Sequence, residues 1–283
     1  MPYLQVRGVD RYYQWILPPE PSAPKPVMVF LHGWGGSGRY WESTARALGD
    51  QFDCLLYDLP GFGRSPLSSA ALSNYELETY ADDLAALLDA LSLEKVYLNA
   101  HSMGASIATL FLNRYRERVE RAILTCSGIF EYNEKEFAAF YRFGGWVVKF
   151  RPRWLGAIPG MDKMFMARFL HRPLDRTSSQ AFLEDFLMAD EEAALGTIYA
   201  CVSQKAAETM PEEFRQLSVP TLLVSGEFDR IISAAMGKQA AKLNSIVQYT
   251  VIPSTGHFPM LEDADTYLKV VREFVNDEYL SNK

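Results

Sequence analysis

At 283 residues, 48% of them hydrophobic, the chain is long enough for one large α/β domain with a substantial core, or for one domain carrying an insertion. Its net charge of −7 argues against nucleic acid as the main partner. The three cysteines have no paired spacing, so they predict neither a disulfide framework nor a zinc site.

The amino-terminal residues lack the basic and apolar regions of a signal peptide. No uninterrupted apolar run approaches the roughly 18 residues that a membrane-spanning helix needs. These two features predict a cytoplasmic protein with no membrane span.

Strand and helix signals alternate over the first 129 residues. Short continuous apolar runs are typical of strands buried on both faces, and longer amphipathic runs are typical of helices. In chain order, the expected elements are strands at 3–6, 12–17 and 27–31, a helix at 40–48, a strand at 53–57, a helix at 74–91, and strands at 96–100 and 119–126. Strands that alternate with helices predict a parallel, doubly wound sheet.

The pattern changes after residue 129. Between residues 130 and 214 strand signals vanish, and helix-like segments are interrupted by glycine and proline. The alternation then resumes with a strand at 219–225, a helix at 233–243, a strand at 247–252 and a helix at 263–276. We therefore expect one core domain formed by residues 1–129 and 215–283, with a helical insertion at 130–214.

One stretch joins an apolar run to a helical pattern, with Ser102 at the join. The residues two before and two after it, Ala100 and Gly104, are small enough to let strand and helix backbones approach closely. This is the pattern of a nucleophile elbow, although Ala100 stands where glycine is usual. The elbow would lift the hydroxyl clear of the sheet, beside the partial positive charge of a helix N-terminus. The alternative is an ordinary serine that caps a helix.

A nucleophilic serine needs a base within hydrogen-bond reach and an acid to orient that base. His257 lies in a loop between the last strand and the last helix, where an imidazole can be presented over the sheet edge. Of the other histidines, His32 precedes a glycine loop, His101 lies inside the elbow and points away from the serine, and His171 lies in the insertion. His257 is therefore the candidate base, with a surface histidine as the alternative.

Two acidic residues follow the strand at 219–225, and either could orient the base. Asp229 is better placed than Glu227, because it comes after the bend, where a carboxylate can lie deep in the turn. The alternative role for Asp229 is to cap a turn or a helix.

The chain resembles the α/β-hydrolase family in five motifs that cover both core segments: H-G-W-G-G-S, D-L-P-G-F-G-R-S, A-H-S-M-G-A, V-P-T-L-L-V-S-G-E-F-D-R-I and G-H-F-P. The order Ser102, Asp229, His257 is also the order of that family's catalytic triad. The resemblance implies the α/β-hydrolase fold, a mostly parallel sheet of about eight strands flanked by helices, with a helical cap inserted after strand six. It implies no cofactor and no metal. It also implies an oxyanion hole formed by the backbone N–H groups of Trp34 and Met103, with the Trp34 side chain lining the pocket.

The insertion, which the resemblance makes a cap over the active site, is rich in aromatic residues and methionine. Such side chains suit an apolar acyl or alkyl group. We expect a substrate pocket lined by Trp34, His101, Phe140, Trp146 and Met164.

The cap is also rich in lysine and arginine, in a protein that is acidic as a whole. One interpretation is peripheral contact with an anionic membrane surface through the cap. The alternative is that the aromatic residues pack the cap on the core while the basic residues are solvated.

A serine nucleophile argues against the dehalogenase and epoxide-hydrolase branches of the family, which use a carboxylate. The leading interpretation is a serine hydrolase that cleaves a lipophilic carboxylic ester through an acyl-enzyme on Ser102. One alternative is a carbon–carbon bond hydrolase, or a related elimination, on the same triad. Another is a small-molecule receptor with little turnover. The sequence makes no prediction of the oligomeric state.

Overall fold

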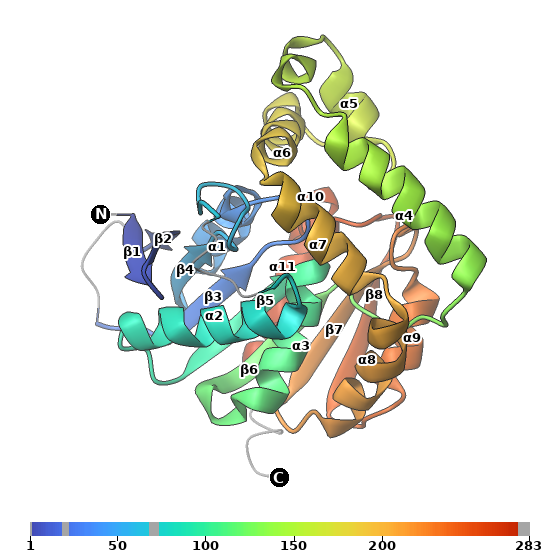
Figure 1. Ribbon diagram of the computed structural model, residues 1–283. Coiled ribbons are helices and arrows are strands. Elements are labelled where there is room, and N and C mark those ends of the chain that lie inside the picture. Colours follow the sequence, from blue (N-terminus) through green and yellow to red (C-terminus); the bar gives the residue numbers. More distant parts are fainter. Residues whose placement is uncertain (1, 19–22, 68–73, 277–283) are drawn as a thin grey trace.

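A sheet of eight strands forms the centre of the protein, whose computed structural model describes residues 2–18, 23–67 and 74–276 (Figure 1). Its strand order is β1-β2-β4-β3-β5-β6-β7-β8. The first three strands in this order pair antiparallel, and all later neighbours are parallel. The strands are β1 (Tyr3–Val6), β2 (Val9–Ile16), β3 (Val27–Leu31), β4 (Asp53–Tyr57), β5 (Val96–His101), β6 (Val119–Thr125), β7 (Thr221–Gly226) and β8 (Val247–Ile252). The predicted mostly parallel sheet of eight strands is confirmed.

Helices cover both faces of the sheet, which explains why its central strands are continuous apolar runs. Successive residues of a strand point to opposite faces, so Met28 and Phe30 enter one core cluster while Val29 and Leu31 enter the other. The first of these clusters lies under α1 (Glu42–Leu48) and α11 (Ala264–Asn276), and the second under α2 (Leu77–Ala90), α3 (Met103–Arg114), α8 (Gln204–Gln216) and α9 (Ala234–Ala241).

Two predicted helices have a separate short helix at their amino-terminal ends, and the helix predicted at 74–91 begins only at Leu77. The helix expected at 40–48 begins as the 3-10 helix η1 (Gly38–Trp41), because the Ser37 hydroxyl caps it by accepting the N–H of Arg39. The helix expected at 263–276 is preceded by a short helix, α10 (Pro259–Glu262), which begins with proline at its first position. A further short helix, η2 (Arg116–Arg118), precedes β6.

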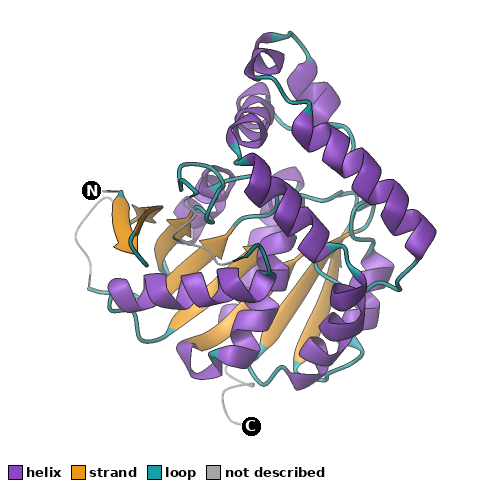
Figure 2. Ribbon diagram, viewed as in Figure 1, coloured by secondary structure: helices purple, strands orange, loops and turns teal. Residues whose placement is uncertain are grey.

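The long insertion follows β6, as expected, and its helices lie over the carboxyl ends of the strands (Figures 1 and 2). Its elements before α8 are α4 (Glu134–Lys149), η3 (Arg153–Ala157), α5 (Met161–Met166), α6 (Arg176–Met188) and α7 (Glu191–Cys201). Among the described residues, no helix is both long and apolar enough to cross a membrane.

Helix α8 falls inside the predicted insertion but packs with α3 and α9 against the sheet. Parallel neighbours such as β6 and β7 need a crossover that returns the chain to the opposite end of the sheet, and α8 supplies it. We therefore propose that the cap comprises residues 130–203, and that the predicted boundary at residue 214 includes one helix of the core.

Candidate active site

Ser102 lies between β5 and α3 in a strained turn. Its backbone angles, φ 54° and ψ −120°, are rare for any residue except glycine. The close approach of strand and helix depends on Gly104, because a Cβ atom there would lie 2.5 Å from the carbonyl oxygen of His32. Ala100, which replaces the usual glycine, is fully buried. The turn has the geometry of a nucleophile elbow.

Ser102, His257 and Asp229 meet in one chain of hydrogen bonds beyond the carboxyl ends of β5, β7 and β8. The Ser102 Oγ lies 3.0 Å from Nε2 of His257, and Nδ1 of His257 lies 2.7 Å from Oδ2 of Asp229. Because a carboxylate only accepts, Nδ1 carries the proton and Nε2 accepts from the serine hydroxyl. This arrangement can take the proton from the hydroxyl and hold it on a buried imidazole.

Asp229 is held on both of its oxygens. While Oδ2 accepts from His257, Oδ1 accepts the backbone N–H groups of Ile231 and Ile232 at 2.8 and 3.1 Å. Burial by itself raises the pKa of Asp229, but the adjacent His257 and these donors together lower it below its usual value. Glu227 is exposed and accepts the N–H of Ser254 instead. The structure thus brings Asp229, and not Glu227, to the histidine.

The two amides expected in an oxyanion hole flank the serine. Met103 is the first residue of α3, where a backbone N–H has no partner within its helix. The loop after β3 passes beside the serine, since a Cβ atom at Gly33 would lie 3.1 Å from the Ser102 Cβ. In the part of the chain that the structure describes, the backbone N–H of Trp34 donates to no other group. Both N–H groups are therefore available to a ligand.

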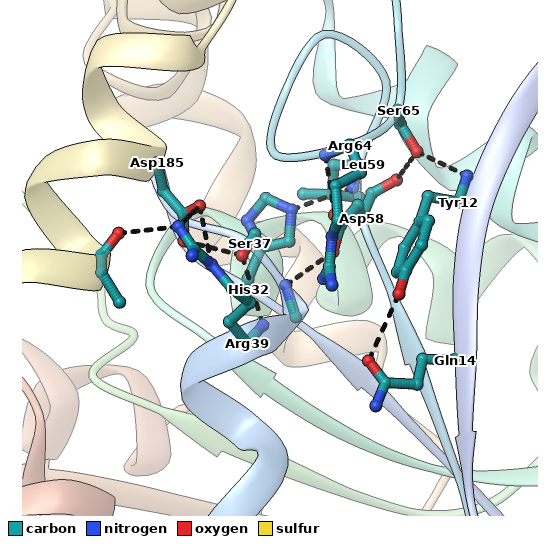
Figure 3. A network of polar contacts seen from close by, with 12 residues as sticks. Tyr12, Gln14, His32, Ser37, Arg39, Asp58, Leu59, Arg64, Ser65 and Asp185 are labelled. Atoms are coloured by element: carbon teal, nitrogen blue, oxygen red, sulfur yellow. Dashed lines mark hydrogen bonds and ion pairs between the residues drawn. The ribbon is translucent and has the colours of Figure 1, made fainter. Parts of the chain in front are cut away.

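His32 fixes this loop in place. Its Nε2 accepts the N–H of Leu59 at 2.9 Å, so its Nδ1 carries the proton and donates to the Gly33 carbonyl at 2.8 Å. Burial lowers the pKa of His32, which keeps the ring neutral. Nearby, Asp58 accepts from Arg64 and from the N–H of Gly38 (Figure 3). No role is predicted for His32 from the sequence, although its place between a buried strand and a glycine loop is a usable signal.

His101 lies behind the candidate base and does not line a substrate pocket as predicted. Its side chain is buried, its Nε2–H donates to the His257 carbonyl at 2.7 Å, and its Nδ1 accepts from the Tyr40 hydroxyl at 2.9 Å. Burial, reinforced by the nearby His257, holds the pKa of His101 well below its usual value. His101, Cys126 and His257 also cluster within 4.8 Å, but each ring nitrogen of the two histidines already has a hydrogen-bond partner.

The cap is tied to the core next to the candidate oxyanion loop. The Trp34 indole N–H donates to the Ala194 carbonyl of α7 at 2.9 Å. Asp185 of α6 accepts from the Ser37 hydroxyl at 2.7 Å and from the Arg39 guanidinium (Figure 3). The cap therefore has defined polar contacts with the loop that carries Trp34.

Cap aromatic residues that face the core form what we call the inner aromatic group. Phe186 lies 5.6 Å from the Trp34 ring and stacks on Phe165, and Phe169 lies 6.2 Å from the His257 ring, measured between centroids. The group consists of Phe165, Phe169, Phe182 and Phe186, all buried or half-buried. These side chains provide an apolar wall next to the candidate triad.

The predicted pocket residues of the cap lie elsewhere. Trp146 and Met164 are 63% and 67% exposed, which does not fit the wall of an enclosed pocket. The side chain of Phe140 is outside the described residues. Trp146 stacks on Phe150 at 5.8 Å, and with Trp154 these residues form what we call the outer aromatic group.

A separate hollow of about 360 Å³ lies at the opposite edge of the sheet, near the amino ends of β6 and β7. Its lining residues are mostly charged or polar and include Arg116, Glu117 and Ser218. It shares no residue with the triad and lies at the end of the sheet away from it.

Comparisons with known proteins identify the family and the fold of the chain. A family model described as the alpha/beta hydrolase fold matches residues 26–264. The pimeloyl-[acyl-carrier protein] methyl ester esterase of Aeromonas hydrophila is 26% identical over 256 residues, covering 88% of this chain and 95% of the relative. The abhydrolase domain-containing protein abhd-5.2 of Caenorhabditis elegans is 27% identical, over 87% of this chain but 58% of its own length. The crystal structure of a putative lipase from Acinetobacter baumannii superimposes with a TM-score of 0.81 at 20% identity, covering 99% of this chain and 91% of the lipase.

Proposed function

Because the chain belongs to the α/β-hydrolase family and is a hydrolase, we propose that it cleaves a lipophilic carboxylic ester through an acyl-enzyme on Ser102. The observation that carries the proposal is the continuous hydrogen-bonded chain from Ser102 through His257 to Asp229. The relative named as a methyl ester esterase, which aligns over nearly its whole length, supports an ester as the substrate.

In the proposed reaction His257 takes the proton of Ser102 while Oγ attacks the ester carbonyl carbon. The negative charge that develops on the carbonyl oxygen is stabilised by the backbone N–H groups of Trp34 and Met103. His257 then gives its proton to the leaving alkoxide, and the acyl group remains on the serine. A water molecule, deprotonated by the same imidazole, releases the acid. Asp229 keeps the imidazole in the required tautomer throughout.

The apolar part of the substrate is assigned to the inner aromatic group. This group lies between the candidate base and the loop that carries Trp34, where an acyl or alkyl chain would be removed from water. Each methylene buried there is worth up to about 0.8 kcal/mol, or roughly fourfold in specificity. Turnover of p-nitrophenyl esters should therefore rise with acyl length until the pocket is full.

The nucleophile is tested with a fluorophosphonate probe and a short p-nitrophenyl ester. Ser102→Ala should abolish labelling and lower ester turnover by about 10³-fold or more, with folding intact. Asp229→Asn should lower the rate by about 10³–10⁴-fold, because the wrong histidine tautomer is then favoured, whereas Glu227→Gln is the matched control and should do far less. Undiminished labelling of the Ser102→Ala protein would refute the nucleophile, and a reversed ranking of the carboxylates would refute Asp229.

We also propose that the outer aromatic group meets an anionic membrane surface. Its three rings are exposed, and they belong to the carboxyl end of α4, the residue that follows it and η3. The end of α4 and helix α5 lie at the apex of the molecule, on the side away from the sheet (Figure 1). Residues 142–168 include six lysines and arginines but one acidic residue, Asp162, which is buried. Exposed aromatic rings among basic side chains are the composition of a surface that enters the headgroup region of anionic lipids.

Arg151 is not part of this surface, because it donates to the carbonyls of Val148 and Phe186 at 2.7 and 2.6 Å and so holds the cap together. Lys149 and Arg153 are exposed. Phosphatidylserine vesicles should therefore co-sediment the protein at low salt and release it at high salt, since exposed charges are screened beyond about 10 Å at 0.1 M.

Lys149→Glu combined with Arg153→Glu should abolish that binding without changing turnover of a short soluble ester. Lys238→Glu combined with Lys269→Glu changes the net charge equally on α9 and α11 and is the matched control. Equal loss of binding in both double variants would mean that net charge, rather than the apex, attracts the vesicles. Absence of wild-type binding at low salt would refute the membrane contact.

A further inference from the structure

A single buried carboxylate lies beside the candidate base without touching its ring. Glu262 ends α10, is 8% exposed, and accepts hydrogen bonds from four backbone N–H groups. Two of these donors, Gly256 at 2.9 Å and Phe258 at 3.1 Å, are the residues on either side of His257. The carboxylate therefore holds the backbone of the histidine loop at both neighbours of the histidine.

The other two donors belong to the cap. The N–H groups of His171 and Arg172, in the connection between α5 and α6, lie 2.7 and 2.8 Å from Oε2 of Glu262. The Arg172 guanidinium also donates to the Glu262 carbonyl at 3.3 Å and to the Asp263 carboxylate at 3.2 Å. One side chain thus links the cap to the loop of the candidate base.

The same cap segment contacts His257 directly. The backbone N–H of His257 donates to the Phe169 carbonyl at 2.7 Å. There is no space between the two segments, since a Cβ atom at Gly256 would lie 2.6 Å from the Phe169 oxygen and 2.8 Å from the His171 nitrogen. The position of His257 consequently depends on the seating of residues 169–172.

We propose that Glu262 is a positioning residue that couples the cap to His257, so that the imidazole is aligned for proton transfer only while the segment 169–172 is in place. The inference rests on the proposed function, in which His257 is the base. It assigns to the cap a role in catalysis besides that of a substrate wall. Phe169, whose ring lies 6.2 Å from the His257 ring, is part of the inner aromatic group, so a substrate that contacts this wall also contacts the coupled segment.

The chemistry of the site requires an anion. Four N–H groups converge on two oxygens, and a carboxylate has about four lone-pair positions to accept them. Glutamine has the same shape but offers one oxygen, and its NH₂ group would face N–H donors that then have no acceptor. Glu262→Gln therefore loosens the contact without creating a cavity.

The experiment compares Glu262→Gln with Asp83→Asn. Asp83 is also a buried carboxylate with several donors, since it accepts from Arg11 and Tyr57, but it lies on α2, away from His257. Glu262→Gln should slow fluorophosphonate labelling and kcat by about 10²-fold, the usual cost of a misplaced catalytic group. The KM for a short p-nitrophenyl ester should stay within about twofold of wild type, because ground-state binding is unchanged. Asp83→Asn should lower the melting temperature while leaving the labelling rate unchanged.

The outcomes distinguish failure of the proposed function from failure of the coupling. If the wild-type protein is not labelled, the proposed function fails. If the wild type is labelled and Glu262→Gln is labelled at the same rate despite a lower melting temperature, the carboxylate is only structural and the coupling is refuted. Should Glu262→Gln not fold, Arg172→Met decides, because Arg172 is partly exposed and its loss leaves the carboxylate intact. Slower labelling of the Arg172→Met protein at unchanged KM supports the coupling, and a wild-type rate refutes it.

Discussion

The inner and outer aromatic groups of the cap have the same chemistry and opposite surroundings. Phe182 and Phe186 on α6 are 6% and 4% exposed because α6 packs on the core loop that begins after β3. Trp146 and Trp154 are 63% and 59% exposed, because neither the end of α4 nor η3 rests on the sheet domain. The inner group therefore builds the contact between cap and core, whereas the outer group is free to meet something else.

Of the substitutions that test the difference between the two aromatic groups, Phe186→Ala should have the largest effect on stability. Removing a ring packed against Trp34 and Phe165 should destabilise the protein by about 3–5 kcal/mol in urea unfolding. The preference for long over short acyl esters should flatten in the same variant, because the apolar wall is lost. A loss of stability below about 1 kcal/mol would mean that the inner group does not join the cap to the core.

A lower pH should lower the free energy of unfolding, because two histidines are buried in the core, and should leave vesicle binding by the outer aromatic group unchanged. Burial lowers the pKa values of His32 and His101, so these rings stay neutral in the folded protein while the unfolded chain takes up protons below about pH 6.5. Stability is then full above pH 6.5 and falls by up to about 1.4 kcal/mol per pH unit for each ring as the pH drops toward the folded pKa values.

Melting temperatures measured from pH 8 to pH 5 check this prediction. A flat profile would show that the two buried rings are protonated as readily in the folded protein as in the unfolded chain. Vesicle binding should persist at the lower pH, because residues 142–168 contain no histidine.

The smallest effect is expected from Trp154→Ala, the counterpart of Phe186→Ala in the outer group. The ring is exposed, so the free energy of unfolding should change by no more than about 0.5 kcal/mol, and turnover of a soluble ester should be unaffected. Binding to phosphatidylserine vesicles should weaken. A loss of stability similar to that of Phe186→Ala would show that the outer ring is a packing residue after all, and the distinction between the groups would fail.

The centre of the sheet is predictable from the sequence because its strands are buried on both faces. The runs at residues 27–31 and 53–57 match the structure at both ends, because so short an apolar segment is typical of a strand that is covered on both faces. Ser102, Asp229 and His257 are predictable for a related reason. Each follows a recognisable strand, and the carboxyl ends of parallel strands meet at one edge.

The cap is less predictable, because helical periodicity predicts which side of a helix is apolar but not which part of the protein packs against that side. Trp146 and Phe150, the latter directly after the end of α4, are four residues apart, which is the spacing of a common helix face, but they stack on each other at the surface and not on the core. Helix α8 has an amphipathic pattern like that of the cap helix α4, so from the sequence only the need for a crossover to β7 assigns it to the core. Glu262 is visible in the sequence only as an acidic residue directly after the apolar run Phe258–Leu261. Its role is not predictable from this position, because two of its hydrogen-bond donors come from residues 171 and 172, far away in the chain.

The backbone angles of Ser102 have a consequence for how this protein can evolve. Such a conformation costs about 1–3 kcal/mol for a residue with a Cβ atom, and glycine would adopt it without strain. The residue that best suits the fold at this position is therefore one that has no hydroxyl. Selection for thermal stability alone would replace the serine, so its presence in a strained turn indicates that stability has been given up to keep a reactive group.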